Sequence, residues 1–153
     1  MKILIFPFAK AMRDAGKNHP KNYPWWPEVV AKLKALGHDV IQVGIDTEPQ
    51  LTEDFRKNLS LTELSALVNS VDTWIGVDSF GQHFCWDQGK PGIVLFGQSD
   101  PEIFGHPENI NLLKSRSYLR EQQFWLWEQA EFNADAFVGP DYVVKTVIEN
   151  FPR

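Results

Sequence analysis

Two short apolar runs, separated by one short segment, constrain the fold of this chain more than any other feature. The first run, 71–77, is followed by Asp78 and Ser79, and the second run is 91–97. Short runs rich in valine, isoleucine and aromatic residues, bounded by glycine or proline, are typical of buried strands. The segment between them turns at small residues and predicts a short helix with His83 just inside it. A strand, a helix and a second strand in this order predict a βαβ unit of a parallel sheet.

The rest of the chain repeats this alternation. Further strands are predicted at 2–9, 38–45 and 109–114, and helices are predicted to begin near 24–27, 60–63 and 139–141. The alternation predicts an α/β fold, a three-layer Rossmann-like domain with a mostly parallel sheet. Right-handed crossovers place the strand-to-helix loops at one edge of the sheet, where α/β proteins bind ligands. Segment 115–137 has no clear periodicity, and we interpret it as an excursion that serves as a lid or an interface.

Length and composition fit one packed domain spanning residues 1–153. Hydrophobic residues make up 43% of the chain and charged residues 23%, so a buried core is feasible. The net charge of -5 and the pI of about 5.3 argue against general binding to nucleic acids or anionic membranes. A single cysteine rules out an intramolecular disulfide, and no apolar run is long enough to span a bilayer. Because the first residues also do not resemble a signal peptide, we predict a cytoplasmic protein.

The segment 10–23 is the most basic part of this acidic chain. Against one acid, Asp14, it carries Lys10, Arg13, Lys17, His19 and Lys21. The segment has no apolar periodicity and is predicted to be a loop that leaves the carboxyl end of the first strand. Charged loops are often simply solvated. A loop at this edge also lies where anionic ligands bind, so the segment is equally a candidate for binding phosphate.

Polar residues that follow two other predicted strands are further candidates for ligand binding. After the second strand, Asp46 or Glu48 either accepts the ribose hydroxyls of a nucleotide or is a solvated turn acid. Ser79 either caps the next helix through its hydroxyl or leaves the helix N–H groups free for a phosphate. Gly81 lets the backbone approach a ligand closely. His83 is either a phosphate donor or a structural histidine.

Several motifs of known chemistry are missing from the sequence. There is no Walker A motif and no G-x-G-x-x-G after the first strand, which disfavours an NTPase and a standard dehydrogenase. There is no G-x-S-x-G nucleophile elbow. His83 and Cys85 are two residues apart, which points them to different sides of a helix, and the other histidines have no paired spacing, so no metal site is expected. Cys85 is predicted to be buried and unreactive.

Four segments, taken in order, carry a family resemblance. They are 26–40, with the Trp26-Pro27 pair and the run from Leu33 to Val40; 60–68, with Ser60-Leu61-Thr62-Glu63; 75–83, with Asp78-Ser79; and 90–101, with Gly97-Gln98-Ser99-Asp100-Pro101. In this order they resemble the C-terminal half of the ADP-heptose:lipopolysaccharide heptosyltransferases, which are GT-B glycosyltransferases of family 9. The resemblance covers about residues 20–110, and the predicted final helix also fits.

The resemblance implies one half of a GT-B fold that binds the nucleotide part of a nucleotide-diphospho-sugar. Asp78, Ser79 and the turn through His83 would surround the diphosphate, with backbone N–H groups and His83 as donors, and Glu48 would hold the ribose. A lysine before the Trp-Pro pair contacts phosphate in the family, which makes the lysines of 10–23 candidates for that role. The expected site residues are Lys10, Lys17, Lys21, Glu48, Asp78, Ser79, Phe80, Gly81, His83 and Gly97.

Two departures from the family pattern affect this interpretation. The family has glycine directly after the Asp-Ser pair, whereas this chain has Phe80, so we expect an altered diphosphate loop. The sequence also has no counterpart of the family's N-terminal domain, which supplies the acceptor site and the catalytic base. We therefore expect a partner chain or a second copy of this chain to complete the cleft.

The resulting functional prediction is a donor-binding domain of a heptosyltransferase-like glycosyltransferase. An ADP-sugar is the favoured ligand, no cofactor is expected, and the catalytic residues are unassigned. Whether the chain is an enzyme by itself stays open. The alternative is a non-catalytic nucleotide or nucleotide-sugar binding module that regulates or sequesters its ligand, and a third hypothesis is an interaction protein that keeps the fold without the ligand.

Overall fold

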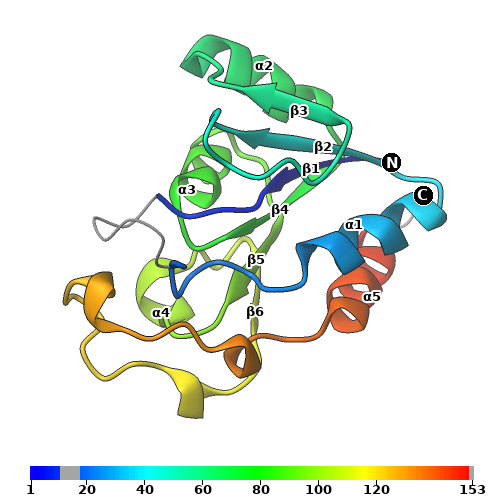
Figure 1. Cartoon of the computed structure of the whole chain (residues 1–153). Helices are drawn as coiled ribbons and strands as arrows, with labels where there is room; N and C mark the ends of the chain where they lie inside the picture. The colour runs from blue at the N-terminus through cyan, green and yellow to red at the C-terminus, as the bar shows by residue number, and fades with distance from the viewer. Residues whose placement is uncertain (11–17, 152–153) are drawn as a thin grey trace.

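The sheet is parallel throughout the described part of the chain. The computed structural model describes residues 1–10 and 18–151. Its six strands lie in the order β3-β2-β1-β4-β5-β6, and every neighbouring pair is parallel (Figure 1). The strands are β1 (Lys2–Phe6), β2 (Asp39–Gly44), β3 (Asp54–Lys57), β4 (Thr73–Val77), β5 (Ile93–Phe96) and β6 (Ile110–Leu113). The predicted α/β fold with a mostly parallel sheet is confirmed.

Helices cover both faces of the sheet, as the three-layer prediction requires (Figure 1). The helices are α1 (Trp26–Ala35), α2 (Leu61–Ser70), α3 (Phe80–Asp87), α4 (Pro101–Phe104) and α5 (Pro140–Asn150). In β1, Ile3 and Ile5 pack into the core beneath α1 and α5, whereas Leu4 and Phe6 pack into the core beneath α2 and α3. Because both faces of the central strands are buried, these strands appear in the sequence as continuous apolar runs. None of the helices in the described ranges is long and apolar enough to span a bilayer.

Local signals in the sequence fix the ends of these helices. Ser60 and Glu63 form a capping box at the start of α2. The Ser60 hydroxyl accepts the Glu63 N–H at 3.1 Å, and the Glu63 carboxylate accepts the Ser60 N–H at 3.0 Å. Trp26, at the start of α1, is 1% exposed and donates its indole N–H to the Pro7 carbonyl at 2.9 Å. This bond ties α1 to the chain that leaves β1, so Trp26 has a structural role.

The chain leaves β1 and β4 in opposite directions along the sheet. From β1 it passes through α1 to β2 on one side, and from β4 it passes through α3 to β5 on the other. The gap between the carboxyl ends of these two adjacent strands is the topological switch point, where open α/β sheets bind ligands. Asp78 and Ser79 follow β4 directly, so the apolar run 71–77 and the two polar residues after it end at this switch point.

Segment 115–137 contains no α-helix; it contains the three single-turn 3-10 helices η1 (Arg116–Tyr118), η2 (Trp127–Gln129) and η3 (Ala134–Ala136). Gln98, just after β5, anchors it from both sides. The Gln98 carbonyl accepts the Arg120 N–H at 3.1 Å, and the Gln98 amide donates to the Glu131 carbonyl at 2.7 Å. The segment therefore stays next to the carboxyl edge of the sheet (Figure 1). Its role as a lid or an interface stays a prediction.

The contact between Gly81 and Phe6 gives a test of this packing. A Cβ at Gly81 would lie 2.8 Å from the Phe6 Cβ and closer still to the ring. We expect Gly81→Ala to lower the free energy of unfolding by about 1–3 kcal/mol, because added volume in a packed core forces shifts. Chemical denaturation measures the change. The control is Gly139→Ala, where a Cβ meets nothing within 4 Å; its effect should be smaller than that of Gly81→Ala, because only the weaker capping preference of alanine at the start of α5 opposes it. Equal effects of the two substitutions would contradict the packing.

Candidate functional site

A cavity of about 200 Å³ opens at the carboxyl edge, beside the switch point. It lies among the ends of β1 and β2, the loop after β2, and the starts of α2 and α3. Its lining residues are Phe6, Phe8, Val43, Gly44, Ile45, Glu48, Asn58, Leu59, Leu64, Ser79, Phe80 and Gly81. We call it the carboxyl-edge cavity. Four residues expected from the sequence, Glu48, Ser79, Phe80 and Gly81, meet here.

The turn after β2 holds the Glu48 carboxylate in place. Its Oε1 accepts the Ile45 N–H at 2.8 Å, and the Glu48 N–H donates to the Ile45 carbonyl at 3.1 Å. Gly44 leaves room for this carboxylate, since a Cβ on Gly44 would overlap Glu48 Oε1. Partial burial raises the pKa of the Glu48 carboxyl, and the Ile45 N–H opposes that shift. No described residue donates to the other carboxylate oxygen, so that oxygen is able to accept from a ligand.

The amino terminus of α3 forms the opposite wall of the cavity. Ser79 occupies the N-cap position with an extended backbone, but its hydroxyl makes no capping hydrogen bond. The first turn of α3 carries no acidic side chain, and Phe80 is 59% exposed. The N–H groups of a first helical turn have no partner inside the helix. Without a side-chain cap, this turn has the character of an anion site.

Asp78 does not line the carboxyl-edge cavity. It is 3% exposed, and its Oδ1 accepts the Gln82 side-chain amide at 2.6 Å. The Lys21 Nζ lies 3.2 Å from its Oδ2, in an ion pair whose lysine side chain is 18% exposed. Asp78 thus holds Lys21 close to the start of α3. Lys21 and Asp78, both expected in the site, thus form an ion pair with each other and do not line the cavity.

Aromatic rings surround the Lys21 ammonium. It lies 5.0 Å from the centre of the Trp127 ring and 5.6 Å from that of Phe104. The Arg120 guanidinium carbon lies 4.1 Å from the Trp127 ring centre. Cations within about 6 Å of an aromatic ring centre are attracted by it, so the contact with Trp127 ties segment 115–137 to Lys21. Lys21 and Trp127 are far apart in the chain, and no local signal in the sequence pairs them.

His83 lies against a second histidine that the sequence did not connect with it. Its Nδ1 is 2.8 Å from Nε2 of His106, and the His106 ring stacks on Trp86 at 4.6 Å. Burial and the His106 charge lower the pKa of His83. The described residues contain no group of three or more histidine, cysteine or acidic side chains able to hold a metal ion. Cys85, on the other side of α3, is fully buried, which raises the pKa of its thiol to about 12.

The remaining expected site residues lie elsewhere. Lys10 is exposed and is not part of the cavity lining. Gly97 is buried against Phe137, because a Cβ on Gly97 would lie 2.7 Å from the Phe137 Cζ. Lys17 falls outside the described residues. The structure therefore brings together the cavity residues and, beside them, the Lys21–Asp78 pair.

The environment of His19 gives a testable pH dependence. Its Nδ1 accepts the Lys21 N–H at 3.1 Å, and burial, reinforced by Lys21, lowers the pKa of the imidazole to about 4. Between that value and the usual pKa of about 6.5, the unfolded chain binds a proton that the folded chain does not. The free energy of unfolding therefore falls as the pH drops through this window. We expect the free energy of unfolding, measured by urea denaturation, to fall less between pH 7 and pH 5 in His19→Gln than in the parent. Identical losses would contradict this assignment.

Comparison with known proteins shows which family this chain resembles in sequence. The sequence profile of glycosyltransferase family 9 (heptosyltransferase) matches residues 2–125. No curated protein matches the chain in a sequence search.

Solved structures share the fold at low sequence identity. E. coli ADP-heptose LPS heptosyltransferase II matches with a TM-score of 0.67 and 14% identity, over 97% of this chain and 45% of that protein. A family 9 glycosyl transferase from Veillonella parvula matches with a TM-score of 0.69 and 20% identity, over 96% and 45%. The iron-containing dodecameric heptosyltransferase TibC of enterotoxigenic E. coli, solved with ADP-D-beta-D-heptose, matches with a TM-score of 0.61 and 19% identity, over 90% and 35%.

The chain thus spans less than half the length of these relatives, as expected for one half of a GT-B fold. The profile match covers most of the chain, and the sheet order and the resemblance read from the sequence agree with it. This chain belongs to glycosyltransferase family 9, the heptosyltransferase family.

Proposed function

We propose that this domain binds the nucleoside diphosphate part of a nucleotide-sugar, with an ADP-sugar as the favoured donor. The observation that carries the proposal is that one cavity joins the Glu48 carboxylate to the uncapped amino terminus of α3. A ribose needs an acceptor for its hydroxyls, and a phosphate needs donors. Glu48 at one end of the carboxyl-edge cavity is an acceptor for the ribose, and the amino terminus of α3 at the other end offers donors to the phosphates. This matches the order of ribose and diphosphate along a nucleotide.

The ribose would lie against Glu48. One oxygen of that carboxylate is already bonded to the Ile45 N–H, which fixes its orientation, and the other is able to accept a ribose hydroxyl. Apolar side chains next to it, among them Leu59 and Leu64, would pack against the sugar or the base.

The diphosphate would lie at the start of α3. Its charge would be met by the N–H groups of the first turn, and the Lys21 ammonium would add positive potential from beside Asp78. During glycosyl transfer, negative charge builds on the departing diphosphate, and fixed donors at that place stabilise the transition state. Phe80 stands where the family has glycine, so the phosphate would be held on one side by a ring that is 59% exposed.

The acceptor and the catalytic base would come from outside this domain. The chain spans less than half the length of its solved relatives, and TibC is described as dodecameric. We propose that a second domain or a second chain faces the carboxyl edge. Phe124, Trp125 and Leu126 in segment 115–137 are 80%, 58% and 52% exposed and are candidates for that contact. A cytoplasmic location stays a prediction, and no observation favours the non-catalytic alternative.

Thermal unfolding with nucleotides tests the donor site. ADP at 100 times its dissociation constant should raise the free energy of unfolding by about 2.7 kcal/mol, which corresponds to roughly 5–10 °C in Tm for a chain of this size. Glu48→Gln keeps the acceptor for the Ile45 N–H but removes the charge, and should cut the shift sharply. A charge-matched control is Glu149→Gln on α5, far from the cavity.

Three outcomes separate the interpretations. No shift with ADP, UDP or GDP would overturn nucleotide binding. A shift that is equal in the parent and in Glu48→Gln would move the site away from the carboxyl-edge cavity. If ADP binds, incubation with an ADP-sugar and measurement of released ADP then distinguish a domain that acts by itself from one that needs the second half.

A further inference from the structure

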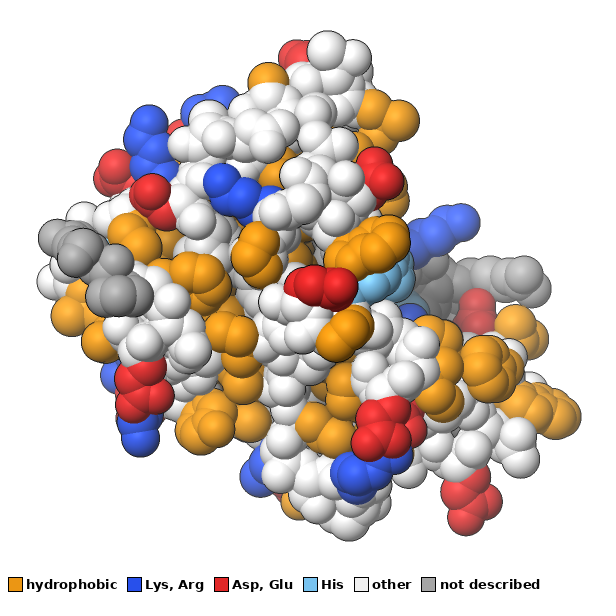
Figure 2. All heavy atoms as spheres, turned by 180° about the vertical axis from the view of Figure 1, so that it is seen from behind, with side chains coloured by type: hydrophobic (Ala, Val, Ile, Leu, Met, Phe, Trp, Pro, Cys, Tyr) orange, Lys and Arg blue, Asp and Glu red, His pale blue; other side chains and the backbone are white. Residues whose placement is uncertain are grey.

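Two histidines from distant parts of the chain meet on the exposed side of α3. His83 lies one turn into the helix and is exposed, and His106 belongs to the loop before β6. The His83 Nδ1 lies 2.8 Å from the His106 Nε2, and the two rings are nearly perpendicular, at 80°. Histidine side chains are visible at the surface in Figure 2, next to hydrophobic side chains. His83 is therefore within reach of a ligand from the solvent.

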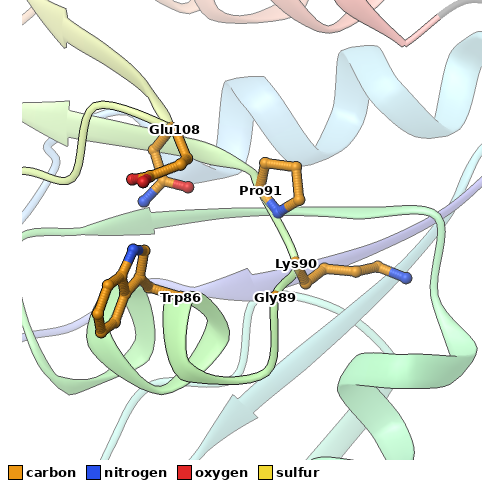
Figure 3. Close-up of a pocket in the computed structure, with 6 residues that line it drawn as sticks. Trp86, Gly89, Lys90, Pro91 and Glu108 are labelled. Atoms are coloured by element: carbon orange, nitrogen blue, oxygen red, sulfur yellow. The ribbon is translucent and has the colours of Figure 1, made fainter.

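Trp86 fixes the His106 ring from the other side. The two rings are stacked, with 4.6 Å between their centres and 11° between their planes. In Figure 3 the Trp86 side chain extends from α3 toward the loop that carries Glu108, and His106 belongs to the same loop. Because a stacked ring has few ways to turn, His106 is a fixed partner for His83. The hydrogen bond between them then sets the direction of the His83 ring.

His106 is the polar partner of His83 within the described part of the chain. No other described residue forms a hydrogen bond with the His83 ring. Neither histidine forms an ion pair with a described acidic side chain. Without such a partner an exposed side chain samples several rotamers, and a ligand that orders it has to offset the lost entropy. His106 removes that cost before a ligand arrives.

The contacts of His106 also determine where the second nitrogen of His83 faces. Trp86 is three residues closer to the carboxyl end of α3 than His83, and His106 contacts both. The Nδ1 of His83 therefore faces the carboxyl-terminal side. The two nitrogens of an imidazole face away from each other, and helical side chains lean toward the amino terminus. Together these constraints direct Nε2 toward the first turn of α3.

A histidine suits this role because its Nε2 either donates or accepts a hydrogen bond. When both rings are neutral, the His106 Nε2–H can donate to His83 Nδ1, which leaves the N–H of His83 at Nε2. When the pair holds one more proton, the His83 Nδ1–H donates to His106, and Nε2 still carries an N–H. A carbonyl or carboxylate partner would instead hold the N–H of a neutral His83 at Nδ1. The pair thus keeps a donor at Nε2 in both states.

The surroundings of His83 limit the pair to one additional proton. Two protonated rings would bring N–H groups against each other at 2.8 Å. Burial lowers the pKa of His83, and the charge of His106 lowers it further. Two charges from other segments act in opposite directions, since Asp78 raises this pKa and Lys21 lowers it. Both belong to the ion pair at the start of α3, so His83 lies within the electrostatic field of that turn.

We propose that His106 is a positioning residue for the diphosphate: it holds the His83 ring so that the Nε2–H donates to a phosphate oxygen at the amino terminus of α3. The proposal rests on the donor site proposed above and adds a directed side-chain donor to the N–H groups of that turn. His106 itself does not touch the ligand. Hydrogen bonds to a charged phosphate are stronger than those between neutral groups, so the direction of this donor affects affinity.

Nitrogen NMR of the imidazole rings tests the positioning on the intact chain. In the ADP complex at pH 8, the His83 Nε2 should carry the proton and Nδ1 should accept a hydrogen bond. In His106→Ala the Nδ1 signal should move, because that hydrogen bond is lost. An Nε2 without a proton in the ADP complex would overturn the proposal. Signals of His83 that are the same in the parent and in His106→Ala would overturn it as well.

Calorimetric titration with ADP at pH 8 measures the effect on affinity. His106→Ala should weaken ADP binding about three- to tenfold, the size expected for one hydrogen bond. His106→Gln should recover most of this loss, because the glutamine amide is able to donate to His83 Nδ1. The control is His38→Gln, a histidine just before β2 at the opposite edge of the sheet. It should leave the affinity unchanged.

The outcomes separate this role from the donor site itself. If the parent binds ADP and His106→Ala binds it equally tightly, the role of His106 is overturned and the donor site stands. If the parent binds none of ADP, UDP and GDP, the donor site and the role of His106 fail together. A loss of affinity that is as large in His106→Gln as in His106→Ala would contradict the hydrogen bond as its cause. If His106→Ala is unfolded by circular dichroism, the proton state of His83 Nε2 in the parent decides.

Discussion

The ion pair between Lys21 and Asp78 is the contact on which the carboxyl edge depends. Asp78 follows the central strand β4 and is 3% exposed, so its charge needs a partner. Lys21 provides that partner and is thereby held at the switch point. The same ammonium lies between the rings of Trp127 and Phe104, which belong to two other segments. One buried carboxylate thus determines where three separate parts of the chain meet.

The parts of the fold that the sequence predicted are those whose cause is local. The central strands β1, β4 and β5 are buried on both faces, so each appears as an apolar run. The start of α2 follows from Ser60 and Glu63, which are three residues apart. The carboxyl edge then follows from the handedness of the crossovers, which is why the sequence predicts Glu48 and Ser79 at the same edge.

The parts that the sequence did not predict depend on contacts between distant residues. β3 is an edge strand with the sequence Asp-Phe-Arg-Lys and partly exposed side chains, so it has neither an apolar run nor a clean alternation. His83 and His106 are 23 residues apart and meet only because the loop before β6 passes α3. The sequence predicts that Gly81 lets the backbone approach a ligand, and the structure shows that the same missing side chain also leaves room for the Phe6 ring. Contacts of this kind between distant residues can be identified only from the tertiary structure.

Helix α3 connects the carboxyl edge of the sheet to its amino edge. It begins at the carboxyl-edge cavity with Ser79 at its N-cap and ends at the amino edge, where Gly89 and Lys90 follow it. At 1.5 Å per residue its 8 residues span about 12 Å. His106 contacts this helix at both His83 and Trp86, so the loop before β6 braces it along its exposed side. The N–H groups that are proposed to meet the diphosphate therefore belong to a helix that the loop before β6 supports at both ends.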